Sequence, residues 1–193
     1  MFVIIEHLKY PFYHTIIYNY FEDIEIQKIV NEIDNIEYQK LDDGHHTQLK
    51  NKAGSDSMCL DDVYSGRRDD SQVLFSISNI INLKLEQYVD KNPFLGYLPM
   101  TNTDLTYVQK YRNGSHYFAH SDTSVLTFLY PIHLKEFDGG QLYFTDHDYT
   151  PRLEHNSILI FPSYKTHKLK EIKSKHDGFV RYSINQRFFI QTC

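Results

Sequence analysis

The residue pair with the clearest chemical potential in this 193-residue chain is His120 and Asp122. If the surrounding segment is an extended strand, side chains two positions apart point to the same side of it. A neutral imidazole and a carboxylate placed side by side can supply two ligands to a divalent metal ion. One further histidine would complete a 2-His-1-carboxylate triad, which leaves coordination positions open for oxygen chemistry on Fe(II). By itself the triplet is a weak signal, since the chain has 11 histidines and 25 acidic residues, and a solvated loop pair is the ordinary alternative.

A third histidine, His167, stands where a ligand from another strand would be expected. It follows the apolar segment 157–162 and a short turn, and it begins the next strand-like segment. A later strand has an alternation that places four polar residues on one face, namely Arg181, Ser183, Asn185 and Arg187. Such a face can simply be solvated. Inside a small barrel it would instead present a guanidinium to an anion, and arginine binds a carboxylate through two parallel hydrogen bonds.

Composition limits the function classes. The chain carries 20 basic against 25 acidic residues, a net charge of -5, which gives no support to a general binder of nucleic acids or acidic membranes. Two cysteines cannot form a disulfide framework or a cysteine-rich zinc site. The apolar run 2–5 is too short for a signal peptide, and no stretch reaches transmembrane length. We therefore expect a soluble, cytoplasmic protein.

The elements that must position these residues begin with an N-terminal part, 1–99. Its β-branched and aromatic residues in 2–20 indicate short strands. Apolar residues at helical spacing predict helices over 24–36 and 72–91. Between these helices, residues 41–70 are polar and lack a clear period, which is typical of a disordered segment or of a functional loop such as a lid over a site.

From residue 100 onward the pattern changes to short segments rich in Val, Ile, Tyr, Phe and Thr. Turn-forming residues such as Asn113-Gly114 and Asp177-Gly178 separate them. The segments that predict strands are 105–111, 116–120, 124–134, 141–145, 157–162, 166–172 and 179–190. We expect a single domain, 1–193, that is mainly β with flanking helices: a sandwich or barrel over 100–193, with the helices packed against one sheet.

The ordered set of these residues resembles the Fe(II)/2-oxoglutarate-dependent dioxygenase superfamily, and within it the prolyl 4-hydroxylase-like group. In that group a Tyr-x-x-Gly stretch precedes His-x-Asp. A hydrophobic strand and a Gly-Gly turn follow, an apolar-Phe-Pro segment leads to the distal histidine, and Arg-x-Ser closes the pattern. The corresponding residues here are Tyr111 and Gly114, His120 and Asp122, Leu126 to Tyr130, Gly139-Gly140, Phe161-Pro162, His167, and Arg181 with Ser183. The resemblance covers residues 100–190 and implies a double-stranded β-helix of the jelly-roll, cupin-like kind.

The resemblance also implies the ligands and cosubstrates. His120, Asp122 and His167 would ligate Fe(II), and Arg181 would bind the distal carboxylate of 2-oxoglutarate. O2 would be the second cosubstrate, with ascorbate as a reductant. Many prolyl hydroxylases have lysine where Arg181 stands, and either cation serves the same cosubstrate.

Two further residues receive a role from the resemblance alone. Ser183 would add a hydroxyl beside the arginine, and Tyr111 would hydrogen-bond the cosubstrate. For Tyr111, a core tyrosine with a satisfied hydroxyl is an equal alternative.

His116 shares the strand of His120 at an even spacing, and we interpret it as a polar rim residue. Six other histidines lie in turn-like or polar surroundings and are expected to be solvated, namely His45, His46, His133, His147, His155 and His176.

The implied activity is hydroxylation of a C–H bond in a prolyl or other amino-acid side chain of a protein, a peptide or a free amino acid. Asp122 favours hydroxylation, because halogenating relatives have a small residue at that position. Two alternatives stay open. One is a nucleic-acid-demethylating oxygenase of the AlkB type, which Arg181, Asn185 and Arg187 loosely resemble, although the acidic balance and the Gly-Gly turn weigh against nucleic acid. The other is a non-catalytic β-helix binding module, which the intact triad argues against. No membrane partner is expected.

Overall fold

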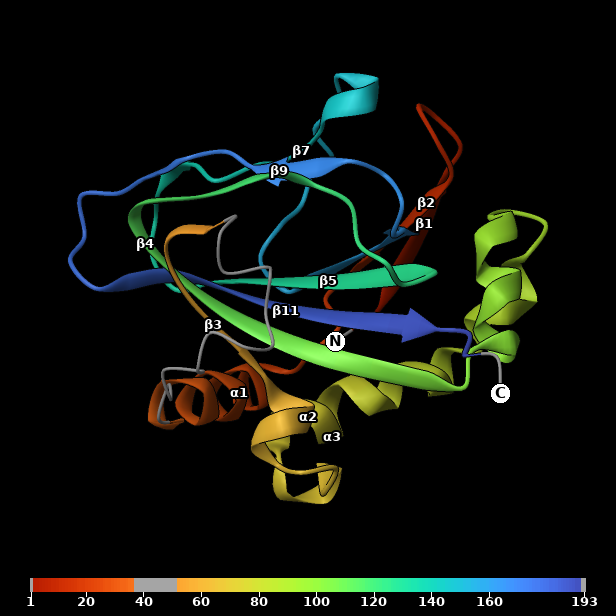
Figure 1. The fold of residues 1–193 in the computed structure, drawn as a ribbon, viewed down its shortest axis with the longest axis horizontal. Coiled ribbons are helices and arrows are strands. Elements are labelled where there is room, and N and C mark those ends of the chain that lie inside the picture. The colour runs from red at the N-terminus through yellow and green to blue at the C-terminus, as the bar shows by residue number, and fades with distance from the viewer. Residues whose placement is uncertain (1, 37–51, 192–193) are drawn as a thin grey trace.

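The structure is a computed structural model that describes residues 2–36 and 52–191 (Figure 1). Its strands are β1 (Ile4–Leu8), β2 (His14–Tyr18), β3 (Lys52–Cys59), β4 (Thr103–His120), β5 (Leu126–His133), β6 (Asp138–Gly139), β7 (Leu142–Phe144), β8 (Ser157–Pro162), β9 (His167–Leu169), β10 (Ile172–Lys173) and β11 (Phe179–Phe189). Its α-helices are α1 (Asp23–Asn35), α2 (Leu60–Val63) and α3 (Gln72–Ser78), and its 3-10 helices are η2 (Arg68–Asp70), η3 (Asn79–Leu83), η4 (Leu85–Tyr88), η5 (Pro93–Met100) and η6 (Thr145–His147).

One antiparallel sheet makes up most of the molecule, in the order β1-β2-β8-β5-β11-β4-β9-β7, with β3 beside β4. A second pair is formed by β6 and β10. The large sheet curls, so that β7 and β9 lie above the layer that contains β5 and β11, while α1, α2 and α3 lie below that layer (Figure 1). This arrangement confirms the predicted fold class, which is mainly β with flanking helices around a jelly-roll core.

β4 connects the two layers because it is long and bent. Its middle pairs with β11, where Tyr111 lies opposite Arg181, and its end pairs with β9, where His120 lies opposite His167. Gly114 has φ +81° in the middle of this strand, a backbone conformation that glycine adopts without steric cost. The sequence pattern predicted two strands with a turn at Gly114. That boundary is wrong, because the glycine bends the strand and the pairing continues beyond it.

α1 and α3 cover the outer face of the lower layer, as predicted for the flanking helices. Ile29 and Ile33 of α1 and Leu74 of α3 are fully buried in one cluster with Tyr182 and Ile184 of β11. Removing each such side chain from water contributes about 1.5–3 kcal/mol. Because neighbouring side chains of a strand point to opposite faces, this packing directs the polar face of β11 into the interior of the curled sheet.

One carboxylate also fixes α1 to the helices that follow it. Glu32 accepts hydrogen bonds from Tyr64 Oη at 2.8 Å, from Ser71 Oγ at 2.6 Å and from Val73 N at 2.8 Å. Val73 N lies in the first turn of α3, where free N–H groups favour a negative charge. The helical layer is therefore held by charge-assisted hydrogen bonds as well as by apolar packing.

Two helical expectations have different outcomes. The helix predicted over 24–36 is confirmed by α1. The helix predicted over 72–91 is wrong beyond Ser78, because α3 ends there and the chain continues as the 3-10 helices η3 and η4, with Lys84 between them at φ +47°. Ser78 Oγ donates to the Phe75 carbonyl oxygen at 2.6 Å, and side-chain bonds of this kind compete with helix formation.

The segment 41–70 was expected to lack regular structure. This is wrong for residues 52–70, which form β3, α2 and η2, and β3 pairs with β4 as an added strand of the sheet. Residues 41–51 lie outside the described residues, so the lid stays an expectation.

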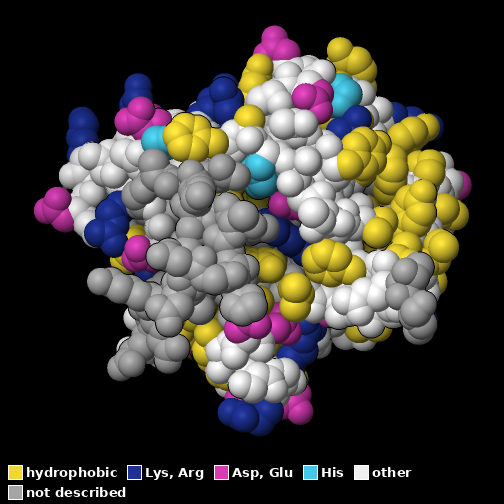
Figure 2. Space-filling model, viewed as in Figure 1, with side chains coloured by type: hydrophobic (Ala, Val, Ile, Leu, Met, Phe, Trp, Pro, Cys, Tyr) yellow, Lys and Arg dark blue, Asp and Glu magenta, His cyan; other side chains and the backbone are white. Residues whose placement is uncertain are grey.

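Exposed apolar side chains gather toward the upper right of the view in Figure 2, around η5, of which Tyr97 and Met100 are exposed. In the described ranges, no helix is long and apolar enough to cross a membrane.

Candidate metal centre

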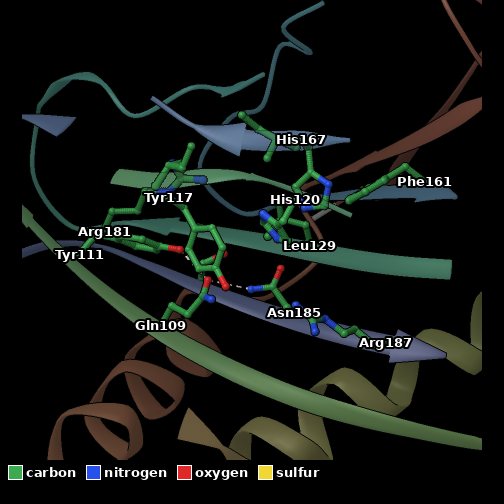
Figure 3. Close-up of a pocket in the computed structure, with 13 residues that line it drawn as sticks. Gln109, Tyr111, Tyr117, His120, Leu129, Phe161, His167, Arg181, Asn185 and Arg187 are labelled. Atoms are coloured by element: carbon green, nitrogen blue, oxygen red, sulfur yellow. Dashed lines mark hydrogen bonds between the residues drawn. The ribbon is translucent and has the colours of Figure 1, made fainter. Parts of the chain in front are cut away.

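The three residues predicted as metal ligands come together. His120 is the last residue of β4, His167 is the first residue of β9, and Asp122 follows β4 in the next turn. One ligand atom from each lies within 4.8 Å of the others. His120 Nε2 is 3.7 Å from Asp122 Oδ1, and His167 Nε2 is 4.0 Å from Asp122 Oδ2. These distances bring the three groups together, so the cluster could hold a metal ion; Figure 3 shows its two histidines side by side.

Backbone carbonyl groups orient both imidazoles. His120 Nδ1 is 2.9 Å from the Phe118 carbonyl oxygen, and His167 Nδ1 is 2.8 Å from the Lys165 carbonyl oxygen. A carbonyl oxygen only accepts, so each Nδ1 carries the proton and each Nε2 keeps a lone pair for a metal. Burial is the largest influence on the pKa of His167 and lowers it, which favours the neutral, ligating form.

Asp122 is held by hydrogen bonds to one carboxylate oxygen and from its N–H, and its other oxygen contacts Arg187. Thr127 Oγ1 donates to Oδ2 at 3.0 Å, and the Asp122 N–H donates to the Ser163 carbonyl oxygen at 2.9 Å. Oδ1 is buried and accepts no hydrogen bond of good geometry from the described residues, although Arg187 Nη2 makes an ionic contact with it at 2.8 Å. A buried carboxylate oxygen of this kind beside two oriented imidazoles fits a divalent metal of the Fe(II) type.

The cavity beside the cluster also contains the predicted anion-binding arginine. Arg181 lines the same cavity as His120 and His167 and is 3% exposed (Figure 3). Its Nη1 donates to the Gly140 carbonyl oxygen, and no described residue accepts a hydrogen bond from its Nε. Burial lowers the pKa of Arg181, but a guanidinium starts from so high a value that it stays charged. The arginine therefore presents an unused donor inside the cavity.

The Gly-Gly turn has a role that the sequence analysis did not assign. The carbonyl group that holds Arg181 belongs to Gly140, and both glycines have positive φ, +72° at Gly139 and +61° at Gly140. A Cβ at Gly139 would lie 2.0 Å from the Glu171 carbonyl oxygen. Only glycine fits this turn, and the turn aims one carbonyl group at the guanidinium.

Tyr111 and Ser183, to which the resemblance gave a role toward the cosubstrate, both line the cavity. Tyr111 Oη donates to Gln109 Oε1 at 2.5 Å, and Asn185 Nδ2 donates to the same oxygen at 3.0 Å. Burial raises the pKa of Tyr111, so its hydroxyl group stays protonated. The hydroxyl group of Tyr111 is therefore satisfied, as expected if Tyr111 is a core tyrosine. Tyr111 is also close to Arg181, whose guanidinium carbon lies 5.8 Å from the centre of the tyrosine ring.

Sequence reasoning missed the role of three residues around Asp122. Thr127 and Ser163 carry no motif of their own, and they act on Asp122 only because β5 and β8 are paired at that point. Arg187 contacts Asp122 directly. A signal for Arg187 was present, since the alternation of β11 placed it on the same face as Arg181.

Among the described residues, the other histidines do not join the cluster. His116 is half-buried, with its ring 4.9 Å from that of Phe118, and it does not belong to the cluster. His133 corrects the expectation of a solvated side chain. It is partly buried against Phe137, and burial together with the nearby Arg181 lowers its pKa to about 3. His45 and His46 lie outside the described residues.

A curled antiparallel sheet that carries a His-Asp-His cluster is the architecture of the 2-oxoglutarate/Fe(II)-dependent oxygenases, and this chain has their fold. Among solved structures it is similar to a Pseudomonas putida prolyl-4-hydroxylase, with 13% identity, 93% of each chain covered and a TM-score of 0.63. It is also similar to a Trichoplax adhaerens prolyl hydroxylase in complex with a hypoxia inducible factor peptide fragment, with 17% identity, 92% of this chain and 83% of that chain covered, and a TM-score of 0.64.

A third similar structure is OsALKBH1, with 15% identity, 95% of this chain and 99% of that chain covered, and a TM-score of 0.57. No protein-family model and no curated protein sequence matches the chain. At these identities the likeness lies in the fold, and the activity has to be argued from the site.

Proposed function

We propose that this chain is an Fe(II)- and 2-oxoglutarate-dependent dioxygenase that hydroxylates a C–H bond. The observation that carries the proposal is the composition of one cavity, which His120 and His167 of the metal cluster and the buried Arg181 line together. A dicarboxylate can use both groups, because one end can chelate a metal while the other accepts hydrogen bonds from a guanidinium.

Each residue has a separate task in this proposal. His120, Asp122 and His167 would hold the iron, which together with 2-oxoglutarate and O2 supplies the oxidising power that amino-acid side chains lack. Arg181 would bind the side-chain carboxylate of 2-oxoglutarate with its unused N–H group. Ser183 would add a hydroxyl donor from the same face of β11. Ascorbate as the reductant is part of the proposal and rests on the resemblance.

Tyr111 would reach the cosubstrate by turning its hydroxyl group away from Gln109. Apolar side chains complete the cavity, namely Leu129, Leu142, Phe161 and Leu169. Such a wall limits water next to the reacting atoms and strengthens the ionic contacts inside. The contribution of the protein is therefore orientation and exclusion of water.

A polypeptide is the substrate class that the surface favours. Tyr164 follows Ser163, whose carbonyl group holds Asp122, and Tyr164 is 58% exposed. Its ring centre lies 6.2 Å from that of Phe94, which in turn is 6.3 Å from Tyr97. This aromatic group leads from the neighbourhood of the metal cluster to the exposed apolar side chains of η5. A continuous apolar surface suits the side chains of a protein or peptide that extends beyond the modified residue. The prolyl hydroxylase with a bound peptide fragment supports the same class.

Demethylation of a nucleic acid is the second candidate. The similarity to OsALKBH1 covers nearly the whole of both chains, and two arginines on β11 line the cavity. The net charge of -5 weighs against it, because binding to a phosphate backbone requires an excess of basic residues.

The test is turnover of 2-oxoglutarate by the Fe(II)-loaded protein. Succinate is measured with proline-containing peptides, with free amino acids and with methylated oligonucleotides, and mass spectrometry identifies the product that gains an oxygen atom. We expect peptides to stimulate succinate formation and His167→Ala to abolish it. Tyr164→Ala should raise the KM for peptides and leave the affinity for 2-oxoglutarate unchanged. Stimulation by oligonucleotides alone would favour the second candidate, and failure of the Fe(II) protein to bind 2-oxoglutarate would contradict both.

A further inference from the structure

The segment 163–176 is basic, although the chain as a whole is acidic. One acidic residue, Glu171, stands among five lysines, namely Lys165, Lys168, Lys170, Lys173 and Lys175. The rest of the chain therefore carries 15 of the 20 basic and 24 of the 25 acidic residues, a net charge of -9. The positive charge is concentrated on a stretch that contains the candidate ligand His167 and continues through β9 and β10.

Four of these lysines, which we call the lysine track, follow His167 along the chain: Lys168, Lys170, Lys173 and Lys175. Lys168 lies opposite Tyr143 in the pairing of β9 with β7, and the Nζ atoms of Lys168 and Lys170 lie 5.1 Å and 4.7 Å from the centre of the Tyr143 ring. Both lysines are on the face of β9 opposite to the buried His167 and Leu169. No carboxylate of a described residue forms an ion pair with the track, so its charges are available to a partner.

The far half of the lysine track lines a groove. Lys173 and Lys175 line it from β10 and the residues after it, and Lys135 lines it from the turn after β5. The groove has a volume of about 1050 Å³, at the upper end of the range for ligand pockets, which accommodates a segment of chain rather than a single ion. Two carboxylates also line it, those of Glu136 and Asp138, and the three lysines outnumber them.

Resting on the function proposed above, we propose that the lysine track and its groove bind an acidic segment of the polypeptide substrate. An extended peptide with acidic residues at alternate positions has their side chains about 6–7 Å apart, which is also the spacing that a strand gives to Lys168 and Lys170. The track begins one residue beyond His167, so the acidic segment lies near the residue to be modified.

The lysine track and the exposed apolar side chains of η5 lie on different sides of the molecule. The chain between β9 and β11 extends to the left end of the view in Figure 1, whereas the apolar side chains around η5 are at the upper right of the same view in Figure 2. The acidic and the apolar parts of the substrate therefore bind in different directions from the metal cluster.

A polypeptide fits this surface better than a nucleic acid because of the charge outside the track. A nucleic acid carries a negative charge at every nucleotide, so its parts beyond the track meet a protein whose other residues have a net charge of -9. A polypeptide can confine its carboxylates to the length of the track. Charge complementarity therefore favours a polypeptide with a short acidic segment.

The experiment measures binding of a fluorescent peptide of about eight glutamates, the length of 168–175, by anisotropy with the full metal-free chain. The wild type should bind the peptide, and more weakly as salt is added, because exposed charges are screened. Each exposed ion pair contributes little, so all four lysines are replaced together, and we expect the affinity to fall by about tenfold or more. This track variant carries Lys168→Gln, Lys170→Gln, Lys173→Gln and Lys175→Gln.

The matched control removes the same number of charges from exposed lysines outside the track, by Lys9→Gln, Lys28→Gln, Lys84→Gln and Lys91→Gln. It should lose much less affinity, since salt screens charges that are far from the bound peptide. Arginine at the four track positions keeps the charge and should keep the affinity. If the track variant does not fold, Lys173→Gln with Lys175→Gln replaces it, and an affinity lower by about threefold or more is expected.

Turnover links the lysine track to the substrate. Proline-containing peptides are made with a glutamate extension and, for comparison, with a glutamine extension. The track variant should raise the KM for the glutamate peptides alone and leave kcat unchanged, because the track lies outside the cavity that holds the reacting groups.

The outcomes separate this inference from the proposed function. Equal losses of affinity in the track variant and its control would overturn the inference while the dioxygenase proposal stands. Tighter binding of a single-stranded oligonucleotide of the same length than of the glutamate peptide would do the same. Failure of the wild-type Fe(II) protein to bind 2-oxoglutarate would overturn the proposed function, and with it the role of the track in substrate binding, whatever the peptide affinities of the metal-free chain.

Discussion

His120 and His167 lie opposite each other in the antiparallel pairing of β4 and β9, with their ring centres 4.3 Å apart. The pairing of the backbone therefore sets the spacing of two of the three candidate ligands. Both rings are also anchored through Nδ1 to a carbonyl group two residues earlier in the chain. The site is preorganised for a metal ion, because neither imidazole has to rotate to present its Nε2.

We expect His167→Ala to lose stoichiometric binding of Fe(II) or Co(II), because only His120 and Asp122 would remain and neither can complete a facial triad. Metal content after dialysis checks this outcome. His116→Ala is the matched control, since His116 is also on β4 but lies outside the cluster. Retention of tight metal binding by His167→Ala would show that another residue is the third ligand.

Arg181→Ala should bind 2-oxoglutarate far more weakly while it still binds the metal. A carboxylate buried without its partner costs about 3–5 kcal/mol, which corresponds to an affinity lower by about a hundredfold to a few thousandfold. Arg181→Lys should lose less, since the charge remains without the second parallel hydrogen bond. The affinities come from anaerobic titration of the Fe(II) protein, followed by the metal-to-ligand absorption band. Wild-type affinity in Arg181→Ala would refute this cosubstrate assignment.

Glu32→Ala should destabilise the fold without affecting the site. Three donors, Tyr64 Oη, Ser71 Oγ and Val73 N, would lose one charged acceptor, and hydrogen bonds to charged groups contribute about 1.5–3 kcal/mol each. Because solvent can replace part of this loss, we expect the free energy of unfolding to fall by about 2–3 kcal/mol in a urea titration. Glu154→Ala, on an exposed side chain, is the control. Equal stability of both variants would argue against a structural role for Glu32.

His133 should make stability depend on pH. Its pKa is lowered to about 3 in the folded protein, first by burial and then by Arg181, whereas an unfolded histidine has a pKa near its ordinary value of 6.5. Between these two pKa values, His133 is therefore protonated in the unfolded chain and neutral in the folded protein. This contribution to stability is complete above the unfolded pKa and is lost as the pH falls toward the folded pKa.

Urea unfolding at about pH 7 and about pH 4 measures this loss of stability. Each unit of difference between the folded and unfolded pKa corresponds to about 1.4 kcal/mol of unfolding free energy. In His133→Gln the loss of unfolding free energy between these pH values should be smaller than in the wild type. His176→Gln, which alters an exposed histidine, should behave like the wild type. The same acid sensitivity in all three proteins would exclude His133 as the cause.

The candidate ligands were predicted through the resemblance, which depends on the order of the motifs along the chain, and local structure explains only part of the site. His120 and Asp122 lie close together in the sequence, and the alternation of β11 fixes the face of Arg181. The bend of β4 at Gly114 could not be predicted in the same way, because Asn-Gly is also typical of a turn, and only pairing with β11 and β9 keeps the strand continuous.

The residues that contact Asp122 could not be predicted from the sequence either. Thr127 and Ser163 reach Asp122 from separate strands, and the contact with Arg187 depends on the curl of the whole sheet. Local sequence patterns carry no information on such contacts. The early end of α3 had a different cause: the apolar spacing up to residue 88 is helical, but the backbone changes to 3-10 turns after Ser78.

Because β4 is one continuous strand, the distance between the two ends of the cavity depends on the number of residues between Tyr111 and His120. Tyr111 pairs with Arg181 and His120 pairs with His167 on this one strand. An insertion or deletion of one residue between Gly114 and His120 would turn the His120 side chain to the opposite face of the strand. The segment between β7 and β8 carries none of the three candidate ligands, so a change of its length does not shift the His120 side chain along β4, as a change within β4 does. Related sequences with a working site should keep the spacing from Tyr111 to His120 constant, and a comparison of their lengths in these two segments would reveal it.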